Sequence, residues 1–228
     1  CVISVSDIES SFILIQQAMN IAEKYQLPVI VLTEKQISES LYTTDSLPPS
    51  PTIVRDLPDG QRRYNITEDG ISNRWIPSKS KPPYLSSSDE HREDGSSSDE
   101  AENSVQMVTK RMKKLRTLER DLPEPRYYGN TKAKDIFIGW GSVKNCILDL
   151  IQQNKDIGYL HYEYIYPLKT KTFEQLIEKG DRNITLVENN KQGQLGELIR
   201  QKTGYEFNTN WSSFVDLNLS NTQSSNPG

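Results

Sequence analysis

The sequence has 228 residues and a formal net charge of −4 at pH 7, and it lacks the basic footprint of a general nucleic-acid binder. It shows neither a signal sequence nor an apolar stretch near the roughly 18–20 residues of a membrane helix, so we expect a cytoplasmic protein. Hydrophobic residues concentrate in residues 1–43 and 135–214, whereas residues 44–104 are rich in Ser, Pro, Asp and Glu. We therefore expect a core at each end of the chain, joined by a polar middle segment.

The first segment is predicted to form a strand, a helix and a second strand. The first strand is Val2–Val5, and Asp7 is a suitable N-cap for a helix from Ile8 to about Tyr25. Apolar residues at helical spacing predict one buried face on this helix, formed by Ile8, Phe12, Ile15, Met19 and Ala22. Residues 27–32 are a continuous apolar run, typical of a strand in a parallel sheet. One such unit cannot close a core, and the sequence starts inside a strand, so we expect a truncated chain whose missing part lies upstream.

A second long helix is predicted from about Asp99 to Arg120, because apolar residues again recur at helical spacing. This apolar stripe consists of Val105, Val108, Met112, Leu115 and Leu118. The other faces carry basic residues, namely Lys110, Arg111, Lys113, Lys114 and Arg116. The basic residues form either a solvated face or a docking surface for an acidic partner.

A second α/β unit is predicted from Asp135 onward, because strands and helices alternate there. Its expected elements are a strand at 135–141, a helix capped by Ser142, a strand-rich run at 157–166, a short helix around 173–177, a strand at 184–187 and a last helix from Gly193 to about Gly204. The alternation predicts an α/β fold with parallel sheets and flanking helices. Cys146 lies in an apolar helical pattern, where we expect a buried, unreactive thiol.

Two glycine pairs follow predicted strands, Gly139 with Gly141 and Gly193 with Gly196, and both are too short for a dinucleotide fingerprint. We expect them to allow close packing of helix on strand. The alternative is that the helix beginning at Gly193 binds an anion at its N-terminus.

Histidine occurs only at positions 91 and 161. His161 alternates with Tyr159 and Glu163 along a strand, so we expect a packed or surface imidazole. His91 is surrounded in sequence by carboxylates, which are expected to favour its protonated form: Asp89, Glu90, Glu93 and Asp94. A metal site and a solvated loop are both open alternatives here.

The order of motifs between Thr67 and Leu115 is the most specific feature of the chain. The motifs are Thr67-Glu68-Asp69-Gly70-Ile71-Ser72, Arg74, Ile76-Pro77, Asp89-Glu90-His91, Glu93, Gly95, Glu102-Asn103, Met107-Val108, Lys110-Arg111-Met112 and Lys114-Leu115. In this order they resemble the alpha subunit of 2-oxoacid:ferredoxin oxidoreductases, which are thiamine-diphosphate enzymes. The resemblance extends over about residues 1–205.

The resemblance implies oxidative decarboxylation of a 2-oxoacid, with 2-oxoglutarate favoured over pyruvate, and transfer of the acyl group to coenzyme A. It implies a beta subunit and ferredoxin as protein partners, ferredoxin being the acidic carrier that the basic helix would dock. The assembled enzyme would contain thiamine diphosphate, Mg²⁺ and an iron–sulfur cluster, none of them bound by this chain alone. The segment is therefore expected to be inactive by itself and to carry no catalytic residue.

Two further expectations concern sites. Gly180-Asp181 and Asn189-Asn190 imitate a diphosphate-binding motif, but the residues between them are predicted to form a strand, so we expect no cofactor there. The resemblance places the loop around residue 90 near the active-site cleft, so Asp89 and His91 are candidates to gate or position the substrate.

The same resemblance predicts the organisation of the chain. Residues 1–45 would end a pyrimidine-binding domain, 46–104 form a long polar loop, 105–125 a connecting helix, 126–210 a transketolase C-terminal-like domain, and 211–228 a tail disordered at its end.

The alternative function is a non-catalytic interaction module that has kept the transketolase C-terminal-like fold. The segment SSSDE occurs twice, at Ser86–Glu90 and Ser96–Glu100, which departs from the family pattern and is typical of disorder. In this alternative the acidic loop binds a partner and is regulated by phosphorylation of Ser88 or Ser98.

Overall fold

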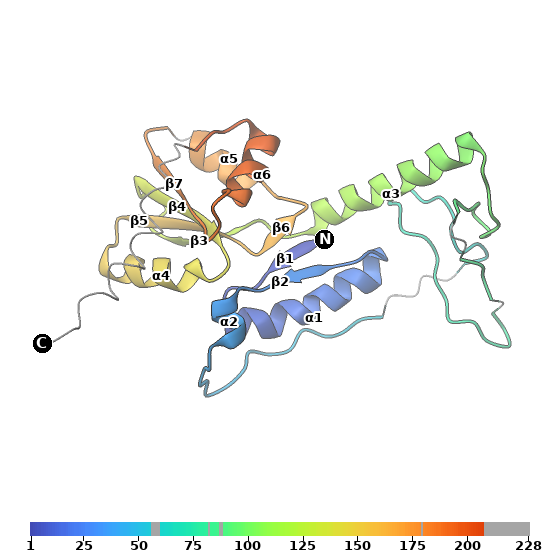
Figure 1. The fold of residues 1–228 in the computed structure, drawn as a ribbon, viewed down its shortest axis with the longest axis horizontal. Helices are drawn as coiled ribbons and strands as arrows, with labels where there is room; N and C mark the ends of the chain where they lie inside the picture. Colours follow the sequence, from blue (N-terminus) through green and yellow to red (C-terminus); the bar gives the residue numbers. More distant parts are fainter. Residues whose placement is uncertain (56–59, 82, 87–88, 179, 208–228) are drawn as a thin grey trace, which may run out of the picture.

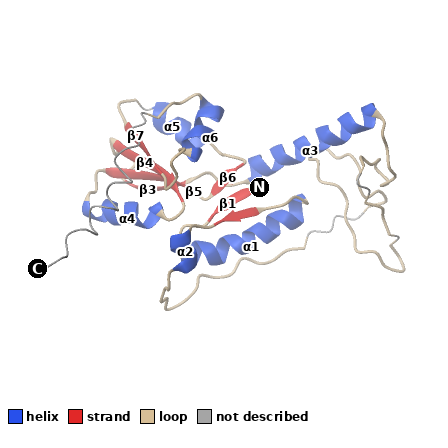
Figure 2. Cartoon of the chain, in the orientation of Figure 1, coloured by secondary structure: helices blue, strands red, loops and turns tan. Residues whose placement is uncertain are grey.

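The computed structural model describes residues 1–55, 60–81, 83–86, 89–178 and 180–207. Two sheets with flanking helices form an α/β fold, which confirms the predicted fold class (Figure 1, Figure 2). Helix α3 (Ala101–Asp121) runs from the end of the molecule where the polar middle segment lies to the region between the sheets. Within the described ranges, no helix is long and apolar enough to span a bilayer.

The first sheet has three strands in the order β2-β1-β6, with bounds Ile30–Leu32, Val2–Ser4 and Tyr164–Tyr166. β1 pairs in parallel with β2, as predicted, and antiparallel with β6. Helix α1 (Ile8–Tyr25) links β1 to β2, and its Leu14 belongs to the same core as the fully buried Ile3. A short helix, α2 (Lys35–Glu39), follows β2.

Helix α1 has the predicted bounds, because its N-terminus is closed by a reciprocal cap. The Asp7 carboxylate accepts a hydrogen bond from the Ser10 amide at 2.7 Å, and the Asp7 amide donates to the Ser10 hydroxyl at 2.9 Å. The predicted buried face is wrong. The helix buries the residues Ser10, Leu14, Ala18 and Tyr25, and it leaves Ile15 and Met19 49% and 53% exposed. The helix has two apolar stripes, and the first sheet and α3 cover only one of them.

The second sheet has the order β3-β5-β4-β7, with bounds Arg126–Gly129, Ile157–Tyr162, Asp135–Trp140 and Asn183–Val187. β4 pairs in parallel with β5 and β7, whereas β3, which the sequence pattern did not predict, pairs antiparallel with β5. One face of the sheet contacts α4 (Val143–Gln153), and the other contacts α5 (Lys171–Glu178) and α6 (Gln194–Thr203). Every residue of β5 is buried, as expected for a central strand.

Close packing explains two of the glycines. A Cβ added to Gly139 would lie 2.5 Å from the Val187 carbonyl oxygen, and one added to Gly196 would lie 2.5 Å from Leu186 Cδ2. A side chain at Gly139 would displace the backbone of the neighbouring strand β7, and one at Gly196 would displace the Leu186 side chain. The packing interpretation is therefore confirmed for both residues.

The two sheets are joined by a direct strand crossing. β5 ends at Tyr162, and after Glu163 the chain enters β6, which pairs with β1. The Glu163 carbonyl also accepts a hydrogen bond from the Ser4 amide at 2.7 Å. The strand-rich run predicted at residues 157–166 is therefore divided between the two sheets: β5 belongs to the second sheet and β6 to the first. Through β6, the C-terminal α/β unit is attached to the N-terminal one.

The described part of residues 40–100 contains no helix or strand, apart from a single bridge between His91 and Ser97. Its first half follows α1, where the Asn20 side chain donates to the Thr52 carbonyl and accepts from the Val54 amide, both at 2.8 Å. Its second half folds against α3 (Figure 1). The polar middle segment is therefore wrapped around the two longest helices.

Two local predictions need correction. Helix α3 begins at Ala101, so residues 101–104 belong to the helix and not to the polar loop, and it ends at Asp121, short of the predicted 125. Cys146 is exposed on α4, because the buried side of that helix carries Val143 and Ile147 instead. The expectation of a buried thiol at Cys146 is wrong.

Candidate functional site

A buried lysine fastens the middle segment to α3. The side chain of Lys110 is 5% exposed, and its ammonium group donates to the Tyr64 carbonyl at 2.8 Å and to the Ser72 hydroxyl at 2.9 Å. Burial lowers the pKa of Lys110 to about 8, and the positive charges of Lys114 and Arg111 act in the same direction. Lys110 therefore clamps both ends of the turn between residues 64 and 72.

The turn itself lies directly on the helix backbone. Gly70 has φ +79°, and a Cβ there would lie 2.4 Å from the Lys114 amide nitrogen and 2.5 Å from the Lys110 carbonyl oxygen. The Thr117 hydroxyl donates to the Asp69 carbonyl at 2.8 Å. Lys114 reaches past the turn and donates to the Gln26 carbonyl at the end of α1, also at 2.8 Å. The motif around Gly70 is thus a turn shaped to fit α3.

This contact corrects part of the predicted apolar stripe of α3: Leu118 is buried and Leu115 packs against the same core, as predicted, but the N-terminal members of the stripe are exposed. The helix buries Met107, Lys110, Thr117 and Leu118, whereas Val105, Val108 and Met112 of the predicted apolar stripe are 66%, 47% and 50% exposed. Lys110 and Lys114 are not part of a solvated face. Lys110 can be buried here because the Tyr64 carbonyl and the Ser72 hydroxyl of the loop accept hydrogen bonds from its ammonium group.

His91 lies within this assembly and stacks on Tyr64, with ring centroids 3.6 Å apart. Its amide donates to the Glu90 carboxylate at 3.1 Å, and its carbonyl accepts from Asn103 of α3 at 3.0 Å. Burial lowers the pKa of His91 below its ordinary value; Glu90 opposes this shift, and Lys110 adds to it. The expectation that neighbouring carboxylates favour the protonated form is therefore wrong, because desolvation outweighs them.

Asp89, the other residue predicted to gate or position the substrate, is exposed. The carboxylate that enters the assembly is that of Glu90, which accepts two hydrogen bonds from the Arg111 guanidinium of α3. These bonds are the main cause that holds the pKa of Glu90 below its usual value. The structure therefore orders the Asp-Glu-His segment through Glu90 and His91 and presents Asp89 to solvent.

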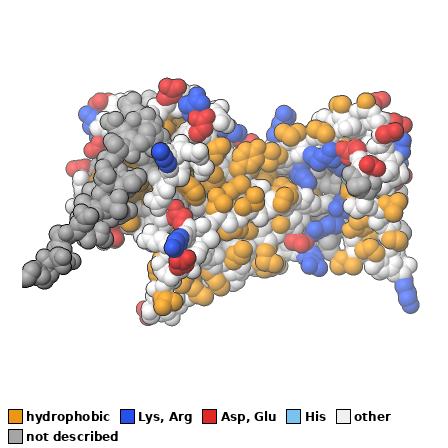
Figure 3. Space-filling model, viewed as in Figure 1, with side chains coloured by type: hydrophobic (Ala, Val, Ile, Leu, Met, Phe, Trp, Pro, Cys, Tyr) orange, Lys and Arg blue, Asp and Glu red, His pale blue; other side chains and the backbone are white. Residues whose placement is uncertain are grey.

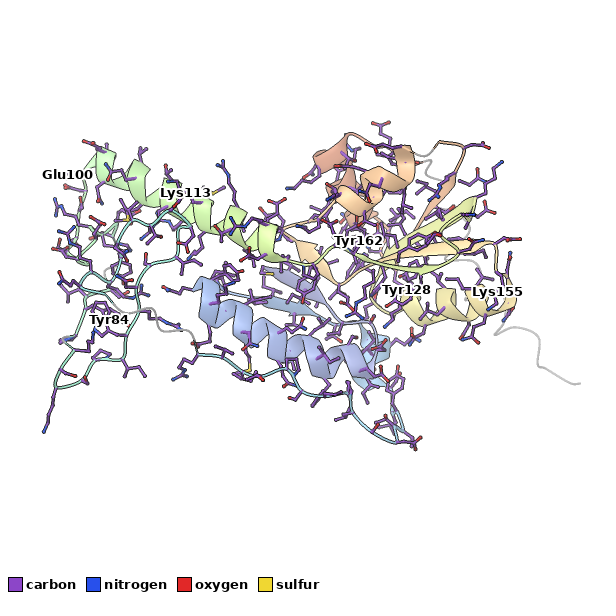
Figure 4. The ribbon with its side chains drawn as sticks, turned by 180° about the vertical axis from the view of Figure 1, so that it is seen from behind. Tyr84, Glu100, Lys113, Tyr128, Lys155 and Tyr162 are labelled. Carbon is purple, nitrogen blue, oxygen red and sulfur yellow. The ribbon has the colours of Figure 1, made fainter. Side chains whose placement is uncertain are left out.

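Aromatic rings and Arg63 complete the site. The Arg63 guanidinium lies over the rings of Tyr64 and Tyr84, at 4.7 and 5.2 Å from their centroids. Tyr84 also contacts the buried Trp75 edge to face (Figure 4). The roles of Tyr64 and Lys110 were not predicted from the sequence, in which Lys110 stands out only by its place in the motif that precedes Leu115.

The structure does not support a metal site at His91. Among the described residues, no group of three or more His, Cys, Asp or Glu side chains could hold a metal ion. Of the two serines proposed for phosphorylation, Ser98 is a poor substrate for a kinase because it is 6% exposed. Its hydroxyl accepts a hydrogen bond from the Glu100 backbone amide at 3.3 Å. Ser88 lies outside the described residues.

The anion site considered at the start of α6 is filled by the chain itself. The Glu188 carboxylate accepts hydrogen bonds from the Leu195 and Gly196 amides at 3.2 and 3.3 Å, and from the Trp140 indole at 3.0 Å. A side-chain carboxylate at a helix N-terminus satisfies amides that lack helical partners. Glu188 therefore closes α6 and leaves no place for a ligand there.

The residues of the apparent diphosphate motif, Gly180-Asp181 and Asn189-Asn190, do not meet at one site. Asp181 is exposed and pairs with Lys134 at 3.7 Å, whereas the side-chain amide of Asn189 donates to the Ser142 hydroxyl at 3.0 Å. Ser142, in turn, does not cap α4 with its side chain; its amide donates to the Glu34 carboxylate at 2.8 Å. These residues do not fit a site for a metal-bound diphosphate.

A cavity of about 280 Å³ lies where the two sheets meet. His161 lines it with a fully buried side chain, whose Nδ1 is 2.8 Å from the Tyr159 hydroxyl. Burial lowers the pKa of His161 to about 3, so the imidazole is neutral. Arg126 and Glu163 form an ion pair at the same junction, at 3.6 Å. The prediction of a packed imidazole at residue 161 is confirmed.

These features define a class of protein: a two-sheet α/β chain in which a long loop is clamped to a helix that leads from one sheet to the other. No family model matches the sequence. The chain is 34% identical over 199 residues to "2-oxoacid:ferredoxin oxidoreductase 1, subunit alpha" of Sulfurisphaera tokodaii, covering 82% of this chain and 31% of the relative. It is 33% identical over 209 residues to the "2-oxoacid:ferredoxin oxidoreductase subunit alpha" of Saccharolobus solfataricus, with coverages of 83% and 32%.

A solved structure agrees with these relatives. The 2-oxoglutarate:ferredoxin oxidoreductase of Magnetococcus marinus, with 2-oxoglutarate, coenzyme A and succinyl-CoA bound, superposes with a TM-score of 0.75 at 25% identity. The match covers 90% of this chain and 38% of that chain. The chain is therefore a homologue of part of these alpha subunits, and it spans about a third of the length of the curated relatives that it matches.

Proposed function

We propose that this chain is a segment of the alpha subunit of a 2-oxoacid:ferredoxin oxidoreductase, comprising the end of its pyrimidine-binding domain and its transketolase C-terminal-like domain. The observation that carries the proposal is the agreement of sequence and fold over the same chain, 82% of it in one comparison and 90% in the other. The complete enzyme would oxidatively decarboxylate a 2-oxoacid to an acyl-CoA and pass the electrons to ferredoxin. We favour 2-oxoglutarate, which is named for the structurally similar protein.

Thiamine diphosphate, Mg²⁺ and an iron–sulfur cluster would be held outside this segment, in the beta subunit or in other parts of the alpha subunit. The apparent diphosphate motif does not fit this group, since Asp181 and Asn189 are engaged with different partners. The segment would supply scaffold and interface, while the substrate, coenzyme A and the electron acceptor would bind in the assembled enzyme.

Within this function, the clamped loop would border the substrate cleft, with Asp89 and His91 gating or positioning the 2-oxoacid. Two features support this role. Asp89 is exposed, and its neighbours Glu90 and His91 are held by Arg111 of α3 and by the Tyr64 ring. His91 stacks on Tyr64, and burial lowers its pKa, which favours the neutral form of the ring.

The test uses the complete alpha subunit assembled with its beta subunit and follows 2-oxoacid-dependent reduction of ferredoxin or a viologen. Asp89→Ala and His91→Ala should lower turnover at saturating 2-oxoacid without changing thermal stability by more than a few degrees. Asp89→Lys should be more harmful than His91→Gln, because only the first reverses a charge. Leu85→Ala, at a 70% exposed position of the same loop, is the matched control. Wild-type turnover in all the Asp89 and His91 variants would exclude the gating role.

A complex that shows no 2-oxoacid-dependent reduction with any of several 2-oxoacids would contradict the proposed enzyme function itself. Comparing 2-oxoglutarate with pyruvate at equal concentration tests the substrate preference. A larger kcat/KM for pyruvate would contradict the preference alone.

A further inference from the structure

An uncovered apolar stripe runs along the N-terminal half of α3. It consists of Val105, Val108 and Met112, whose exposed fractions are 66%, 47% and 50%. Their spacing places them on one side of the helix, and the opposite side is occupied by the loop that Lys110 clamps. Because the loop already covers the other side, the stripe does not face the core of this chain.

Two exposed cations, Lys113 and Arg116, flank the stripe. Neither takes part in an ion pair or a hydrogen bond with any residue that the structure describes. The other basic residues of this helix are engaged. Lys110 donates to the Tyr64 carbonyl and the Ser72 hydroxyl, and Lys114 donates to the Gln26 carbonyl. Arg111 pairs with Glu90, and Arg120 pairs with Asp121. Figure 3 shows hydrophobic side chains along α3 next to Lys and Arg, and Figure 4 marks Lys113 on the helix.

An apolar centre with a charged rim is the pattern of an interface between proteins. A second copy of this chain fits it poorly, since a two-fold contact places the same patch on both sides and would bring Lys113 and Arg116 close to their own symmetry mates. A surface with carboxylates around an apolar centre would instead match both the stripe and its flanking cations.

We propose that this face of α3 docks a partner subunit of the enzyme complex, through a partner surface that is apolar at its centre and acidic at its rim. The inference rests on the proposed function for the existence of a partner subunit, but the surface follows from α3 alone. Val108 lies in the middle of the stripe and makes the central contact. Lys113 and Arg116 steer and orient the partner through its carboxylates.

The experiment measures the dissociation constant between the complete alpha subunit and its beta subunit by surface plasmon resonance. Val108→Asp should weaken binding at least about tenfold, because it places a charge at the centre of an apolar contact. The double variant Lys113→Glu/Arg116→Glu should weaken binding about tenfold at low salt, with a smaller effect at high salt. Leu150→Asp, at a 39% exposed position of α4, and Lys155→Glu are the matched controls and should change binding by less than about twofold.

The results separate the possible occupants. If wild-type subunits do not bind one another, the proposed function fails. If they bind and both sets of α3 variants bind equally well, the docking surface is refuted. If Val108→Asp unfolds the alpha subunit on its own, the stripe is covered by another part of the same chain, and the proposal is likewise refuted. Self-association of the alpha subunit that Val108→Asp abolishes would assign the face to a second copy, which also overturns the proposal.

Discussion

The strongest energetic prediction concerns the clamp at Lys110. Its side chain is 5% exposed and its pKa is about 8 in the folded protein, against an ordinary value of 10.5. Between these two pH values the unfolded chain binds the proton and the folded chain does not. Folding therefore releases a proton in this window, so the free energy of unfolding rises as the pH increases through it.

The size of the effect follows from the pKa difference. One pKa unit corresponds to about 1.4 kcal/mol, so the shift from 10.5 to about 8 gives a contribution on the order of 3 kcal/mol when it is complete. Part of it is reached by pH 9.5, below the range in which exposed tyrosines ionise. Lys110→Met removes the titrating group and keeps much of the buried volume, and it should flatten the pH dependence.

The assay is urea unfolding from pH 7.0 to 9.5, followed by tryptophan fluorescence, which includes the buried Trp75 of the clamped loop. The difference between wild type and Lys110→Met should grow in favour of the wild type with increasing pH. Lys113→Met, an exposed lysine on the same helix, is the control and should run parallel to the wild type. Parallel curves for wild type and Lys110→Met would refute the argument that burial depresses the pKa of this lysine.

Other predictions test the closure of α6, the turn on α3 and the division of cofactor binding. Glu188→Ala should lower the free energy of unfolding by about 1–3 kcal/mol, measured in urea, because two amides of α6 and the Trp140 indole lose their acceptor; an unchanged midpoint would contradict this. Gly70→Ala should release the loop and raise its rate of proteolysis, since its Cβ would lie 2.4 Å from the Lys114 amide nitrogen. Gly180→Ala, where φ is also positive but the space is open, should leave proteolysis of the loop unchanged. Calorimetry with thiamine diphosphate and magnesium should show no binding to this chain alone, and micromolar affinity would contradict the proposed division of cofactor binding.

The sequence by itself determined the class of fold and most of the elements. The bounds of α1 followed from Asp7 and the helical periodicity, and the strands β4 and β7 followed from short apolar runs bordered by polar residues. Local signals are sufficient here because capping and strand propensity depend on neighbouring residues. The two strands β3 and β6 were missed as separate elements, because their pairing partners are distant in sequence.

The site was predictable only in part. The order of motifs drew attention to Asp89 and His91. It did not show that Tyr64 stacks on His91, or that Glu90 and not Asp89 faces Arg111. Those contacts join segments that are far apart in the chain.

Tertiary structure alone decided which faces of the helices are covered. Periodicity marked Ile15 and Met19 on α1 and Val108 on α3 as core positions, yet all three are exposed in the folded chain. Lys110 was expected in solvent and is buried. A sequence pattern records that a residue is apolar or charged, but the cost of its exposure or burial depends on what packs against it. For Lys110 that cost is offset by the Tyr64 carbonyl and the Ser72 hydroxyl, which only the folded loop brings within hydrogen-bonding distance of its ammonium group.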